Sequence, residues 1–85
     1  MEKELIEGIA IIQRSKRKEQ VLKDLENKIK TPSRISKSTG ISIHHVSRYL
    51  KQLKDNELVI CLNEEFNQGR LYQTTDLGKK VLKYL

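Results

Sequence analysis

The sequence predicts a mainly α domain with one β-hairpin, on two observations. Apolar residues recur at three- and four-residue intervals along most of the chain, which is the spacing of amphipathic helices. Two short strand-like runs, 58–62 and 71–75, flank a polar stretch that contains Gly69, as the strands of a hairpin do. With 85 residues the chain makes one small domain.

The first two helices are expected at 2–13 and 16–29. The apolar face of the first consists of Leu5, Ile6, Ile9 and Ile12. A strand is the alternative for 9–12, because β-branched residues favour it. Ser15 is a suitable N-cap for the second helix, whose apolar face consists of Val21, Leu22, Leu25 and Ile29.

The next two helices are joined by a tight turn. Thr31 can cap the third helix and Pro32 suits its first position. Gly40 ends it, since glycine tolerates left-handed φ. Ser42 caps the fourth helix, at 43–55, whose apolar stripe consists of Ile43, Val46, Leu50 and Leu53. Two helices around such a turn indicate a helix-turn-helix.

The hairpin at 58–75 follows the fourth helix directly. Thr75 can cap a closing helix, and its apolar residues are Leu77, Val81, Leu82 and Leu85. A hairpin in this place is the wing of a winged helix. The predicted fold class is therefore a winged helix-turn-helix over 14–85, with an additional helix at 1–13.

Composition narrows the class of partner. Lys and Arg number 17 against 11 Asp and Glu, a formal charge of +6, which favours a polyanion, either nucleic acid or an anionic membrane surface. No apolar run approaches the ~18 residues of a membrane span, and no signal-peptide core is recognisable. The one cysteine, Cys61, rules out an internal disulfide. We therefore expect a cytoplasmic protein.

The residues that catalysis needs are not evident. The sequence has no Gly-rich phosphate loop, paired-carboxylate constellation or nucleophile elbow, so we expect neither an enzyme nor a bound cofactor. His44 and His45 diverge by about 100° on a helix, which makes joint chelation of a metal difficult. No metal site is expected.

The side of the fourth helix opposite its apolar stripe is cationic and centred on Arg48. Arg can bond guanine with two hydrogen bonds and Gln can do so with adenine, in a groove that admits one helix. We predict that this helix enters the DNA major groove and reads bases through His44, His45, Arg48, Lys51 and Gln52. An ordinary solvated helix face, which is also polar, is the alternative.

Contacts with the DNA backbone are predicted on both sides of this helix. The start of the third helix favours an anion through its free amides and dipole, and the wing can reach the backbone or the minor groove. The predicted contacts are Thr31, Ser33, Arg34, Asn67, Gln68 and Arg70. A surface charge at a strand start is the alternative for Arg70. Glu64 and Glu65 are expected on the side of the wing away from DNA.

Residues 31–59 and 69–78 resemble archaeal winged helix-turn-helix transcriptional regulators related to the ArsR and MarR groups, and 14–18 resembles the entry to their first core helix. The likeness covers 14–84. It implies sequence-specific binding of double-stranded DNA, usually as a homodimer held by terminal helices. The resemblance also implies that Ser42 and Ser47, which match positions of the family's groove-reading segment, contact bases. Two positions depart from the family pattern: Ser36 stands where a small apolar residue is commoner, and Thr74 stands where Leu is commoner.

The helix at 1–13 is additional to a winged core, so we predict a homodimer in which it packs on the closing helix of a second chain. The predicted interface is Leu5, Ile6, Ile9, Ile12, Val81, Leu82 and Leu85, and packing within one chain is the alternative. The sequence thus predicts a DNA-binding transcriptional regulator, a repressor. A sequence-independent chromatin-type DNA binder and a winged-helix protein adaptor are the rival functions.

Overall fold

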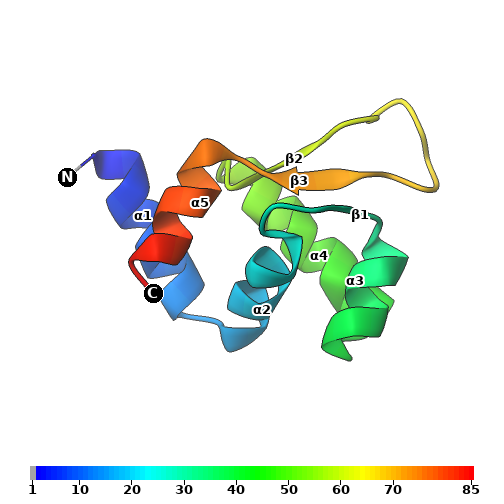
Figure 1. The fold of residues 1–85 in the computed structure, drawn as a ribbon, viewed down its shortest axis with the longest axis horizontal. Helices are drawn as coiled ribbons and strands as arrows, with labels where there is room; N and C mark the ends of the chain where they lie inside the picture. Colours follow the sequence, from blue (N-terminus) through cyan, green and yellow to red (C-terminus); the bar gives the residue numbers. More distant parts are fainter. Residues whose placement is uncertain (1) are drawn as a thin grey trace.

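A computed structural model describes residues 2–85, and it confirms a mainly helical fold with a small antiparallel sheet. Within these residues lie five helices and three strands (Figure 1). In chain order they are α1 (Lys3–Gln13), α2 (Lys16–Leu25), β1 (Ile29–Lys30), α3 (Pro32–Thr39), α4 (Ile43–Asp55), β2 (Val59–Cys61), β3 (Tyr72–Thr74) and α5 (Asp76–Lys83).

The predicted helix caps are confirmed. The hydroxyls of Ser15, Thr31, Ser42 and Thr75 each accept the backbone N–H three residues ahead, which satisfies an amide that has no partner within the helix. Gly40 ends α3 with a φ of 77°, a left-handed conformation that costs glycine little. These local bonds explain why α3 and α4 begin where the sequence predicts.

The helix predicted at 16–29 is too long. α2 ends at Leu25, and Asn27 follows with a φ of 60°, which turns the chain out of the helix. Ile29 then lies in β1, where it pairs with Gln73 of β3, and its side chain is 50% exposed. Its helical spacing from Leu25 is therefore coincidental, and β1 is a strand that the sequence did not predict.

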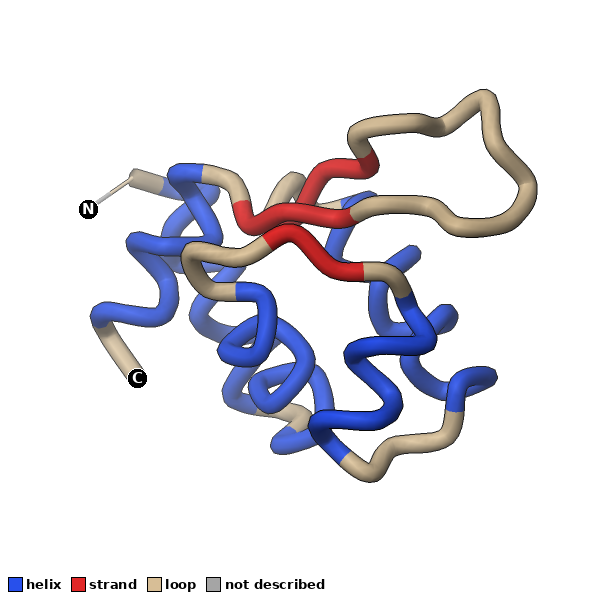
Figure 2. Tube along the Cα trace, turned by 45° about the vertical axis from the view of Figure 1, so that its right-hand side comes forward, coloured by secondary structure: helices blue, strands red, loops and turns tan. Residues whose placement is uncertain are grey.

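The sheet has the order β1-β3-β2, with both neighbouring pairs antiparallel. The predicted hairpin is confirmed, with Val59 opposite Thr74 and Cys61 opposite Tyr72, although its strands are shorter than 58–62 and 71–75. Figure 2 shows the loop between β2 and β3, the wing loop (residues 62–71), projecting well away from the helices.

Polar contacts fix β1 and α3 against α2. The ammonium of Lys30 lies 2.9 Å from the Asp24 carboxylate, and the Ser38 hydroxyl donates to the same carboxylate at 2.6 Å. One acid on α2 thus holds a residue of β1 and a residue in the last turn of α3, and thereby ties both elements to α2.

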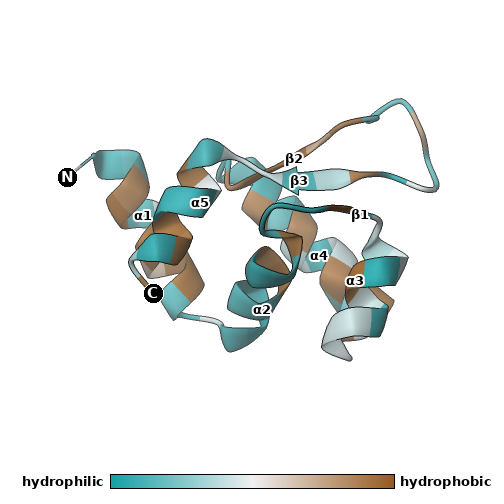
Figure 3. Ribbon diagram, viewed as in Figure 1, coloured by the Kyte–Doolittle hydropathy of each residue, from teal (hydrophilic) through white to brown (hydrophobic). Residues whose placement is uncertain are grey.

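The core draws apolar side chains from every helix and from the sheet, and Figure 3 shows α1, α4 and α5 with distinct apolar and polar faces. The predicted stripe of α4 needs one correction. Val46, Leu50 and Leu53 are fully buried, but Ile43 is 43% exposed. Ile41, in the turn before α4, is buried at that end of the core instead.

α1 packs against α5 of the same chain, and the two helices lie side by side in Figures 1 and 2. Leu5, Ile12 and Val81, three members of the predicted dimer interface, are buried in this single-chain core, so a second chain could not reach them without opening it. Ile6 and Leu85 are exposed, and Ile9 and Leu82 are partly buried. Packing within one chain thus accounts for the three buried members of that set.

Candidate nucleic-acid interface

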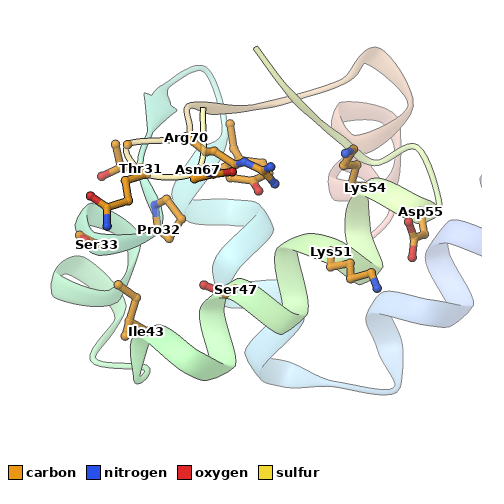
Figure 4. A pocket seen from close by; sticks show the side chains of 13 residues that line it. Thr31, Pro32, Ser33, Ile43, Ser47, Lys51, Lys54, Asp55, Asn67 and Arg70 are labelled. Carbon is orange, nitrogen blue, oxygen red and sulfur yellow. The ribbon is translucent and has the colours of Figure 1, made fainter. Parts of the chain in front are cut away.

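A groove of about 760 Å³ lies between α4, the start of α3 and the wing loop. We call it the wing groove. In Figure 4, Arg70 and Asn67 lie beside Thr31 and Pro32, across from Ser47 and Lys51. Its lining consists of Thr31, Pro32, Ser33, Ile43, Ser47, Lys51, Lys54, Asp55, Asn67, Gln68, Gly69, Arg70 and Tyr72.

The structure divides the predicted base-reading residues between two flanks of α4. Ser47 and Lys51 line the wing groove. His45 and Gln52 lie on the other flank, since each residue advances the helix by about 100°. His44 and Arg48 are exposed between the flanks. The sequence prediction centred the reading face on Arg48, whereas the groove opens on the side of Lys51.

Several of these side chains already have partners within the chain. The His45 ring nitrogen Nδ1 lies 3.0 Å from the Ser42 hydroxyl, and its ring is 6.3 Å from that of Tyr49. The guanidinium of Arg48 is 5.7 Å from the same Tyr49 ring, within the range of a cation–π contact. Tyr49 therefore contacts both Arg48 and His45, on the flank of α4 away from the wing groove.

Gln52 is less accessible for a base contact than the sequence predicts. The residue is half-buried, and its amide oxygen Oε1 is buried without a hydrogen-bond partner within residues 2–85. In this rotamer the amide cannot accept and donate to an adenine at once, as bidentate recognition requires. Gln52 would have to turn outward before it could read a base.

Most of the predicted backbone contacts come together. Thr31 and Ser33 from α3 and Asn67, Gln68 and Arg70 from the wing loop line the same groove. Arg34 is exposed outside this lining, and its backbone N–H donates to the Thr31 hydroxyl at 3.3 Å. The groove thus joins the start of α3 to the wing, two segments that are far apart in the sequence.

The wing loop is held in shape by two of its own side chains. Arg70 donates from Nε to the Phe66 carbonyl at 2.7 Å and from an Nη to the Glu64 carbonyl at 3.2 Å. Asn63 donates to the Gly69 carbonyl at 3.2 Å and accepts the Leu71 N–H at 2.8 Å. The sequence prediction did not include Asn63, although Asn is frequent in turns for this reason.

Glu64 does not line the wing groove. It lines a neighbouring recess with Glu57 and Cys61, and its carboxylate forms an ion pair with the ammonium of Lys54, which lines both the recess and the groove. That Glu64 and Glu65 face away from DNA stays a prediction. The hydrogen bond from Lys54 lowers the pKa of the Glu64 carboxyl below its usual value, and the same bond raises the pKa of Lys54. Lys54 was absent from the predicted site because nothing local links it to the wing.

We also searched the described part of the chain for a metal site, a membrane-spanning helix and a reactive cysteine. Its His, Cys, Asp and Glu side chains form no group of three that could hold a metal ion. None of its helices is both long and apolar enough to cross a bilayer. Cys61 is half-buried, and its thiol donates weakly to the Asn63 amide oxygen at 3.7 Å.

A helix-turn-helix with a sheet-supported loop beside its second helix defines a winged-helix class of protein, a typical DNA-binding and non-catalytic fold. The chain belongs to the winged helix-turn-helix family, because the family model described as "Winged helix-turn-helix" matches residues 13–85. No curated protein sequence matches the chain.

Proposed function

We propose that the protein is a sequence-specific transcriptional regulator that binds double-stranded DNA and acts as a repressor by occupying its site. The observation that carries this function is the wing groove, with the cations Lys51, Lys54 and Arg70 along it. With α4 in the major groove, the adjacent sugar-phosphate backbone would lie between α4 and the wing loop. The finer likeness to archaeal ArsR- and MarR-type regulators rests on residues 31–59 and 69–78.

The side chains of the wing groove suit a phosphate backbone. Thr31, Ser33 and Ser47 offer hydroxyl donors, and Asn67 and Gln68 offer amide donors. Such groups set the position of a protein on a duplex, whereas base-edge contacts supply the specificity. We assign the specificity to His44 and Arg48, which are exposed on α4 next to the groove. Asp55 is the acid at the far end of the lining.

Selection from random DNA duplexes tests this function. A regulator is expected to enrich one motif within a few rounds, and each mismatch in that motif should cost ~1–3 kcal/mol of binding free energy. Binding with a steep salt dependence but no enriched motif would indicate a sequence-independent chromatin-type binder. Absence of duplex binding at low salt would leave the protein-adaptor function.

Arg70→Lys is expected to weaken duplex binding by about three- to ten-fold. Lysine keeps the charge, but one ammonium cannot reproduce the planar fork of donors that bonds the Phe66 and Glu64 carbonyls. Fluorescence anisotropy across a salt series is the measurement. The salt slope should stay unchanged in Arg70→Lys, because the number of charges is the same. Wild-type affinity in this variant would mean that Arg70 acts only as a charge.

We also propose a homodimer through the outer faces of α1 and α5. Three apolar side chains remain substantially exposed on α1 and just beyond the end of α5: Ile6 at 52%, Tyr84 at 57% and Leu85 at 38%. We expect light scattering at micromolar concentration to give twice the chain mass of 9.9 kDa, and Ile6→Glu to return it to one chain mass without loss of helix. A wild-type species of one chain mass would refute the dimer.

A further inference from the structure

We propose that Lys54 is a DNA phosphate contact which Glu64 occupies in the free protein, and that the two separate when a duplex backbone enters the wing groove. In this arrangement the Glu64 carboxylate stands in for a phosphate. The exchange presupposes the duplex binding proposed above.

The position of Lys54 supports a role in binding. It lies on the groove side of α4, one turn beyond Lys51, and its side chain lines the same groove (Figure 4). At 39% exposure the side chain is open to solvent, so a backbone phosphate could approach the ammonium. Successive cations along one flank of a helix suit a run of successive phosphates.

The partner of Lys54 comes from the wing and not from its own helix. Asp55 also lines the wing groove, and Glu57 and Glu64 line a recess beside Lys54. Within residues 2–85, the ion pair of Lys54 is with Glu64. The backbone carbonyl of Glu64 accepts a hydrogen bond from Arg70, so the loop shape that builds the groove also places this carboxylate over Lys54.

The pair is well suited to exchange. The Glu64 side chain is 54% exposed, and ion pairs between exposed side chains contribute little to stability. A phosphate is a comparable acceptor for an ammonium group and draws further stabilisation from counterion release. Binding would leave Glu64 without its cation and close to DNA, so this residue restrains affinity.

A double-mutant cycle on a fluorescein-labelled duplex of mixed sequence, at fixed low salt, tests the exchange. Glu64→Gln is expected to bind about two- to five-fold more tightly than wild type, the range of an exposed ion pair. Glu65→Gln is the matched control, because Glu65 is an exposed neighbour in the same loop, and its affinity should change less. In the Lys54→Gln background, the gain from Glu64→Gln should shrink.

An equal gain from Glu64→Gln in both backgrounds would overturn the exchange, because Glu64 would then act only by general repulsion. A loss of affinity in Glu64→Gln would also overturn it, because the pair would then be needed to shape the wing.

A second measurement follows the Glu64 carboxyl by NMR titration in the free and the duplex-bound protein. The pKa of Glu64 should lie below its usual value in the free protein, where Lys54 stabilises the charged form. It should rise on binding, when Lys54 leaves and phosphates approach. A pKa that stays low in the complex would mean that the pair remains closed, and a normal pKa in the free protein would mean that it does not form.

These outcomes separate the two proposals. If wild type binds the duplex and the cycle shows no coupling, the exchange fails while DNA binding stands. If neither wild type nor any variant binds the duplex at low salt, the DNA-binding function itself fails.

Discussion

Gly78→Ala is expected to lower the free energy of unfolding by about 2–3 kcal/mol, with a fall in Tm on the order of 10–20 °C. A methyl group at this position would lie 2.7 Å from Thr74 Cγ2 and well inside van der Waals contact with the Leu58 carbonyl oxygen. That carbonyl cannot easily move, because it accepts the Thr75 N–H at 3.1 Å. The measurement is thermal and urea unfolding by circular dichroism.

Gly8→Ala is the matched control, since it adds the same atom to another buried helical glycine. There the methyl group would meet the flexible ends of Val81 and Leu58, at 2.8 and 3.2 Å. Alanine also gains about 1 kcal/mol of helix propensity over glycine, which offsets much of the crowding. We expect a change within about 1 kcal/mol. If the two substitutions lowered stability equally, the clash with the Leu58 backbone carbonyl would not be the cause of the Gly78→Ala effect.

Arg48→Ala is expected to weaken binding to the selected site by about 5- to 150-fold, or ~1–3 kcal/mol, and to relax specificity at one base position. Arg48 is exposed on α4, so its loss should leave the fold unchanged, and alanine is a good helix former. Affinities for the site and for single-base variants of it, measured by anisotropy, show both effects.

Arg34→Ala provides the comparison. Arg34 is exposed on α3 outside the wing groove, where we propose a contact with the DNA backbone. Loss of this contact should weaken binding to all sequences alike and reduce the salt slope by about one. Unchanged affinity in both variants would be incompatible with the proposed regulator and would favour a protein adaptor.

The helix boundaries show where sequence reasoning succeeds. Thr31, Ser42 and Thr75 start their helices with bonds that span three residues, and Gly40 ends one through its own backbone conformation. Such signals are local, so a sequence displays them directly. The same is true of the hairpin, whose two strands adjoin a single loop.

The misplaced residues all depend on contacts between distant segments. Ile29 continues the apolar spacing of α2, but it pairs with Gln73 in a strand. Ile43 continues the stripe of α4, but Ile41 is the residue buried at that end of the core. Periodicity indicates which residues can share a face, and packing decides which of them are covered.

The candidate nucleic-acid interface, too, could be predicted from the sequence only in part. The sequence indicated a cationic face on α4 and polar groups at the start of α3 and in the wing. It did not indicate which flank of α4 the wing loop approaches, and so it placed Arg48 at the centre and omitted Lys54. The ion pair of Lys54 with Glu64 joins a helix to a loop, and no spacing rule connects them.

The sequence by itself thus determined the order of the helices, their caps, the hairpin and the basic character of the chain, because these follow from short-range hydrogen bonding, periodicity and composition. The tertiary structure alone decided that α1 packs on α5 of its own chain, that β1 completes a three-stranded sheet and that the groove opens beside Lys51 and Lys54. Each of these depends on burial between segments distant in sequence, where several arrangements satisfy the same local pattern and only packing selects one.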